Sequence, residues 1–246
     1  MPRLLDSGTV VEPSAGTTLS VKESARRCEF AFPLSLRHFI NNPTPECPFL
    51  AGVRLHLKVL QEPTVRISTM LKSMRMVYRD VPLTVEIVSR ETLTALPNFF
   101  ANKTGIANFD ALLDLDVGPC TSNQALTTEQ TQLYQNRNNV NNNFHIVVYF
   151  VRRVLENGTD TMFGCAGPSD TLPISIAISE VATRWTLAHE VGHALGLQHV
   201  AGEACDPGDV STNLMTGCGT DTIIGIPTLS QTEQSTMNAH PLVGNF

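Results

Sequence analysis

One stretch decides the fold expected of this chain: His189-Glu190-Val191-Gly192-His193-Ala194-Leu195-Gly196-Leu197-Gln198-His199. Residues 183–188 begin polar and continue with apolar side chains at helical spacing, which predicts a helix that runs through His193. On that helix His189 and His193 lie four residues apart on one face, where both imidazoles can reach a single metal ion. Glu190 is the next residue round the helix. Its carboxylate is therefore expected beside the metal, where it can act as a general base on a metal-bound water.

Gly196 predicts how a third histidine reaches the same ion. A residue without a Cβ, three positions after His193, lets the helix end in a left-handed turn and the chain reverse direction. His199 is then carried back toward the metal. Three neutral imidazoles and one water are the ligands of a tetrahedral catalytic zinc site, so we expect one catalytic Zn²⁺ bound by His189, His193 and His199.

The motif continues downstream with Asn213-Leu214-Met215-Thr216. The pattern His-Glu-x-x-His-x-x-Gly-x-x-His followed by a Met-turn is the metzincin signature, and the chain resembles this clan of zinc endopeptidases. The resemblance implies that Met215 forms a hydrophobic floor beneath the imidazoles and is not a ligand. It also implies a hydrolase that cleaves internal peptide bonds through a zinc-activated water, with Glu190 as general base and then general acid.

The subfamily stays open. The run from Gly192 to Leu197 is closest to matrixins and serralysins, and the cysteines on either side of the Met-turn resemble those of pappalysins. The tyrosine ligand that astacins and serralysins carry shortly after the methionine is absent. The sequence does not show whether calcium binds. A second hypothesis is a catalytically silent zinc-binding module that holds a peptide. Glu190 disfavours it, because such a module has no need of a general base beside an open zinc position.

Composition limits the partners. Of the 246 residues 16% are charged and 42% hydrophobic, and the net charge of −6 is spread without runs. We therefore expect neither a nucleic-acid nor an anionic-membrane partner. The longest strongly apolar stretch, residues 146–151, is far shorter than the roughly 20 residues of a transmembrane helix. The expected partner is a protein or peptide substrate, and the oligomeric state cannot be read from the sequence.

Six cysteines are spread singly, without a Cys-x-x-Cys pair. This pattern disfavours a structural zinc site and predicts three disulfides in a secreted, extracellular protein. The alternative is six reduced cysteines in a cytosolic protein. We expect one disulfide between Cys205 and Cys218, which flank the Met-turn, and one between Cys28 and Cys47. Residues 1–6 show no apolar run of about 7–15 residues, so no signal peptide is visible and the export route stays open.

The chain divides into two expected parts. Residues 1–50 carry six prolines and no sustained period, which predicts an irregular N-terminal extension or remnant prosegment. Residues 51–246 form the metzincin-like catalytic domain. For it we expect a zincin-like α+β fold, with a twisted mixed sheet of about five strands, an antiparallel edge strand, an active-site helix and a C-terminal helix.

Several elements of this domain follow from periodicity. Residues 53–60 alternate as a strand with one buried face, 65–78 form a helix and 83–88 a second, parallel strand. Residues 128–134 are helical and 144–151 form a central strand buried on both faces. Pro173 places the strand 172–179 at the sheet edge, where metzincins bind substrate as an added strand. Residues 218–229 form an apolar loop that by resemblance walls the primed-side pocket, and residues 230–233 are a capping box that begins the last helix.

Overall fold

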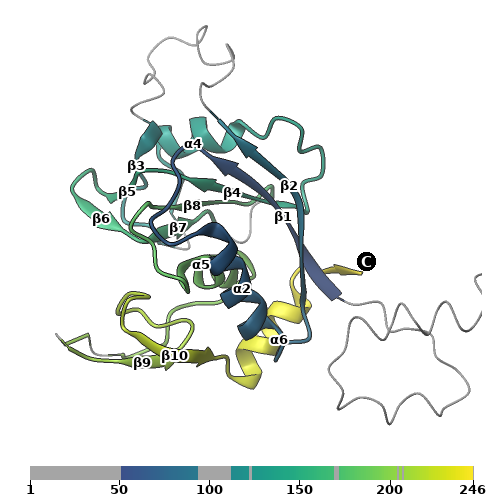
Figure 1. Cartoon of the computed structure of the whole chain (residues 1–246), viewed down its shortest axis with the longest axis vertical. Coiled ribbons are helices and arrows are strands. Elements are labelled where there is room, and N and C mark those ends of the chain that lie inside the picture. Colours follow the sequence, from purple (N-terminus) through teal and green to yellow (C-terminus); the bar gives the residue numbers. More distant parts are fainter. Residues whose placement is uncertain are drawn as a thin grey trace, which may run out of the picture. The chain divides into compact units, whose positions relative to one another are not determined.

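The computed structural model describes residues 51–93, 112–121, 124–168, 172–203, 205–206 and 208–245. The predicted N-terminal extension and its Cys28–Cys47 pair lie outside these residues. Residues 50–246 form one compact unit. Its described part is an α+β fold built on a mixed sheet, as expected (Figure 1).

The domain begins with the predicted strand–helix–strand unit. Strand β1 (Ala51–Val59) pairs in parallel with β2 (Thr84–Thr92), and helix α2 (Ile67–Tyr78) connects them. Most of the apolar side chains whose spacing predicted α2 are buried in the core beside the sheet, and Leu71 is partly buried there. The Tyr78 hydroxyl donates a 2.7 Å hydrogen bond to the carbonyl of Ala188, which ties α2 to the helix that carries the histidine motif.

The centre of the sheet is β4 (Ile146–Phe150), whose five residues are all buried, as predicted for the interior of 144–151. The strand is shorter than predicted, because Phe144 lies before it and is exposed. It pairs in parallel with β1 on one side and with β8 (Ser175–Ile178) on the other. Alternate residues of β4 enter two separate cores. One core lies with α2 on one face of the sheet, and the other lies with α4 (Thr128–Gln135) on the opposite face (Figure 1).

The edge-strand prediction is wrong in its location. Strand β8, within residues 172–179, is interior because it also pairs antiparallel with β7 (Gly164–Ala166), which is the edge. Pro173 precedes the first residue of β8, so its missing N–H removes no ladder hydrogen bond. The short strand β11 (Gly244–Asn245) adds an antiparallel pair at the start of β1.

The polar face of β1 is more buried than the predicted alternation, with one buried face, would suggest. His56 and Lys58 occupy the polar positions of the alternation, yet they are 5% and 2% exposed. The Lys58 ammonium donates to Glu91 at 2.8 Å and to the carbonyl of Asn138 at 3.0 Å. These partners satisfy its polar atoms inside the protein, which makes burial of the residue tolerable.

The remaining elements surround this sheet. Strands β3 (Asp114–Asp116), β5 (Arg153–Glu156) and β6 (Asp160–Met162) form a small sheet of their own. Helices α4 and α6 (Gln231–Ala239) both begin at capping boxes, at Thr127 and at the predicted Ser230. Among the described residues no helix is long and apolar enough to span a membrane.

The segment 218–229, expected as a loop, contains strand β10 (Ile223–Thr228), which pairs in parallel with β9 (Ser211–Asn213). The pairing joins only Ile223 with Ser211 and Thr228 with Asn213, with a register shift between them. Three exposed residues lie in between. Such a strand has no alternating pattern, which is why periodicity did not predict it.

Candidate metal centre

Helix α5 (Thr186–Ala194) carries the first two histidines and ends as predicted. Gly196 has φ +87°, the left-handed conformation. The Leu197 amide donates to the carbonyl of Gly192 at 3.0 Å, and the Gly196 amide donates to the carbonyl of His193 at 2.9 Å. This pair of bonds is a Schellman motif, which satisfies the last carbonyls of the helix and reverses the chain toward His199.

The three histidines meet through their Nε2 atoms. The Nε2 of His193 lies 3.1 Å from that of His189 and 3.1 Å from that of His199, and the third distance is 3.3 Å. Tetrahedral coordination at about 2.0–2.1 Å would place such nitrogens roughly 3.3–3.4 Å apart. The residues therefore fit one Zn²⁺. Within the described ranges no other three His, Cys, Asp or Glu side chains lie close enough to share an ion.

Backbone carbonyls fix the orientation of two of the rings. The Nδ1 of His189 donates to the carbonyl of Leu214 at 2.7 Å, and the Nδ1 of His193 donates to the carbonyl of Leu197 at 2.8 Å. A carbonyl only accepts, so in each neutral ring the proton sits on Nδ1 and Nε2 keeps its lone pair. Burial lowers the pKa of His189 to about 3 and that of His193 to about 4, and it also lowers the pKa of His199. The triad is thus neutral at pH 7, as metal ligation requires.

Met215 lies under the histidine helix. It is fully buried, and a Cβ on Gly192 would lie only 2.7 Å from its sulfur. Gly192 therefore has a role that the sequence analysis missed, although a glycine within a helix is itself a signal of close packing. The amide of Val200 donates to the carbonyl of Met215 at 3.0 Å, which joins this turn to the residue after His199.

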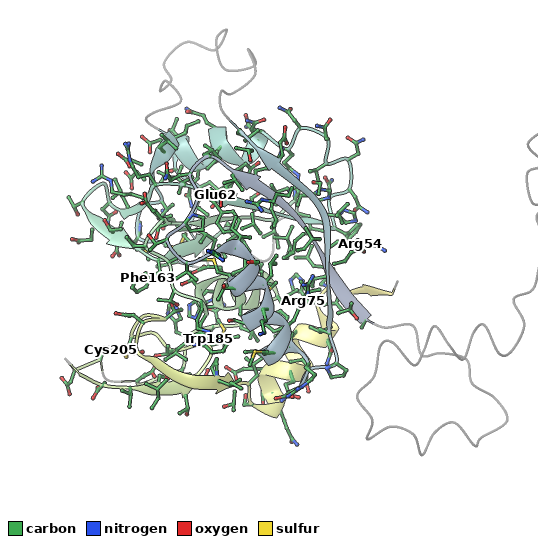
Figure 2. The ribbon with its side chains drawn as sticks, in the orientation of Figure 1. Arg54, Glu62, Arg75, Phe163, Trp185 and Cys205 are labelled. Carbon is green, nitrogen blue, oxygen red and sulfur yellow. A yellow bond between two sulfur atoms is a disulfide. The ribbon has the colours of Figure 1, made fainter. Side chains whose placement is uncertain are left out.

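Two disulfides lie near the site. Cys205 and Cys218 are bonded, as predicted, on either side of the Met-turn, and Figure 2 shows Cys205 beside the β9–β10 sheet. The sequence analysis named no partner for Cys120 or Cys165, and these two cysteines are bonded to each other. It joins the segment after β3 to the middle residue of β7, two segments that are 45 residues apart.

Glu190 is buried behind the triad, against β7. Its carboxyl accepts a hydrogen bond from the backbone of Ala166, and burial raises its pKa to about 8 despite that bond. A Cβ on Gly164 would lie 2.8 Å from the Cγ of Glu190 and 2.9 Å from its Oε1. β7 thus contacts Glu190 at two of its three residues.

The triad and Glu190 open into a cleft of about 480 Å³, bounded by β7, the end of α5 and residues 216–220. Gly219 and Thr220, from the segment expected to wall a pocket, line it. A hollow of about 560 Å³ lies elsewhere, at His56, His145 and the Asn-rich residues 139–143. It holds no third metal ligand, so the chemistry points to the smaller cleft.

The fold is similar to the crystal structure of archaemetzincin from Methanopyrus kandleri. The match has a TM-score of 0.45 at 13% sequence identity, and it covers 77% of this chain and 95% of that one. No protein-family model matches the chain, and no curated protein sequence matches it.

Proposed function

We propose that this protein is a zinc-dependent endopeptidase of the metzincin type. One observation carries the proposal: three neutral imidazole Nε2 atoms lie 3.1–3.3 Å apart at a cleft, with a buried carboxyl on the same helix. Structural zinc sites are closed by four protein ligands, whereas catalytic sites have three and an open position. A cleft-lining triad matches the catalytic kind.

In this proposal His189, His193 and His199 hold the ion. Zinc, when bound, acidifies a water and polarises the scissile carbonyl. Glu190 takes a proton from the attacking water and later returns it to the leaving amine nitrogen. Burial, which raises the pKa of Glu190 to about 8, supports the second transfer, because such a carboxyl holds a proton well enough to donate it at neutral pH. A zinc ion, when bound, would support the first transfer, because a nearby cation favours the carboxylate that accepts the proton.

The substrate is proposed to be an extended peptide. Among the described residues β7 pairs with β8 alone, which leaves its other edge without a strand partner, next to the cleft. An extended chain can add to such an edge through main-chain hydrogen bonds, a mode that reads backbone more than side chains. This supports cleavage of internal bonds in polypeptides.

Glu190→Ala tests the mechanism. A diverse peptide pool is digested with zinc-loaded wild-type and variant protein, with and without a chelator, and zinc content is measured beside each digestion. We expect the variant to keep its zinc and to lose turnover by about 10²–10⁴-fold, the usual cost of removing a general acid–base. Near-wild-type cleavage by the zinc-loaded variant contradicts the role of Glu190. Failure of the zinc-loaded wild type on every peptide favours the silent binding module.

The described disulfides, Cys120–Cys165 and Cys205–Cys218, suit an oxidising compartment. Secretion stays a prediction. Mass spectrometry of a non-reduced digest of the protein from its native source would test it, because free thiols at these four positions would indicate a reducing compartment.

A further inference from the structure

We infer that Gly164 is a positioning residue for Glu190: the absence of a side chain at this point of β7 sets where the Glu190 carboxylate lies. The effect of Gly164 on catalysis rests on the proposed peptidase function. The position of the Glu190 carboxyl relative to Gly164 depends only on contacts between β7 and α5.

Gly164 and Ala166 face the same side of β7, because side chains alternate along a strand. Both lie against Glu190, one through the space left by the missing Cβ and the other through its backbone hydrogen bond. A Cβ on Gly164 would meet the Cγ, Oε1 and Cδ of Glu190 at 2.8, 2.9 and 3.0 Å. These separations are below van der Waals contact, so with alanine at position 164 either β7 or Glu190 must move.

The structure indicates that Glu190 moves. β7 is paired with β8 at all three of its residues. The flanking Phe163 carbonyl and Gly167 amide bond to the backbone of residues 179 and 175, each at 2.9 Å. The Cys120–Cys165 disulfide holds the opposite side of the strand. Glu190, in contrast, reaches β7 with the end of a flexible side chain beside an open cleft.

Alanine can replace Gly164 without backbone strain. Its φ lies outside the left-handed region, so alanine can adopt the same backbone conformation. The added methyl group points at Glu190. To restore van der Waals contact, the Glu190 side chain must move by about 1 Å. A displacement of about 1 Å can cost 10²-fold in rate.

The test is Gly164→Ala in the full chain, with Gly244→Ala as the matched control. Gly244 is also a strand glycine outside the left-handed region, and a Cβ there meets nothing within 4 Å. We expect Gly164→Ala to bind zinc at the wild-type ratio and to lose about 10²-fold in kcat, with KM within about threefold. Gly244→Ala should match wild type in all three measurements.

A double-mutant cycle separates positioning from general damage. In a Glu190→Ala background, Gly164→Ala should cost no further activity, since the displaced group is already gone. The same truncation should restore any stability that Gly164→Ala loses alone, which keeps the test valid if the single variant folds poorly. Additive activity losses, or a kcat of Gly164→Ala within twofold of wild type, overturn the inference.

A crystal structure of Gly164→Ala tests the position of the Glu190 carboxyl independently of any activity measurement. We expect the Glu190 carboxylate to have moved and β7 to have stayed. A shifted β7 with an unmoved Glu190 carboxylate would overturn the inference even if the wild type is an active enzyme. If the wild type cleaves no peptide but the carboxylate moves as expected, the proposed function fails and the positioning by Gly164 stands.

Discussion

Replacing Glu190 with glutamine should make the metal-free protein more stable while removing the proposed general base. Burial raises the pKa of Glu190 from 4.5 to about 8. The folded state therefore favours the protonated carboxyl. The stability that this preference contributes is fully present below pH 4.5 and is lost as the pH rises through about 8. Glutamine has nearly the same shape and no charge to desolvate.

The size of the effect follows from the two pKa values of Glu190. At about 1.4 kcal/mol per unit of pKa, raising the pH from 4 to 9 costs the wild type about 5 kcal/mol relative to Glu190→Gln, and about 3 kcal/mol of this appears by pH 7. The lowered histidine pKa values act in the opposite direction at lower pH, but both proteins share them. Bound zinc should shrink the difference, because a nearby cation favours the carboxylate.

The assay is urea unfolding of wild type and Glu190→Gln in chelator between pH 4 and 9, repeated with zinc. The free energy of unfolding of the wild type should fall away from that of the variant as the pH rises. Parallel curves would refute the reasoning, because they would mean that Glu190 is not held in an environment that penalises its charge. The variant should lose peptide cleavage in either case.

Three further outcomes are expected. His199→Ala should lose zinc or bind it far more weakly by elemental analysis, and full retention at native affinity would show that His199 is not a ligand. Replacing Cys205 and Cys218 together by serine should lower the free energy of unfolding by about 3 kcal/mol in denaturant titrations, as for a closed loop of this length; an unchanged midpoint would contradict it. Burial lowers the pKa of His56 to about 4, so its contribution to stability, present above pH 6.5, should disappear as the pH falls to 4. Between pH 6.5 and 4, the free energy of unfolding of the wild type should fall by about 2 kcal/mol relative to that of His56→Gln. Equal changes in the two proteins would mean that the His56 ring is solvated.

The meeting of the three histidines was predictable from the sequence because they are close together in the chain. His189, His193 and His199 span eleven residues, and helical geometry with one left-handed glycine brings them to the same side of the helix end. The carbonyl of Leu214 then fixes the orientation of the His189 ring. The capping box at Ser230 and the parallel pairing of β1 with β2 are local in the same sense, since each depends on a short motif or one crossover.

Only the tertiary structure shows the surroundings of Glu190. β7 has three residues, too few for a period of two to be recognised, and it contacts Glu190 from a position 26 residues earlier in the chain. Spacing alone does not select the Cys120–Cys165 bond, which is only the pair left over when Cys28–Cys47 and Cys205–Cys218 are assumed. The raised pKa of Glu190 has the same origin, because desolvation depends on what covers a carboxyl and not on its neighbours in sequence.

The burial of His56 and Lys58 is the remaining example. An alternating strand predicts one solvated face only when nothing covers its polar side, and here Glu91, His145 and the carbonyl of Asn138 cover it. The sequence by itself thus determined which atoms can bind a metal and how the chain turns to present them. Packing between distant segments decided which groups are desolvated and where the Glu190 carboxyl lies, because those contacts form only when the chain has folded.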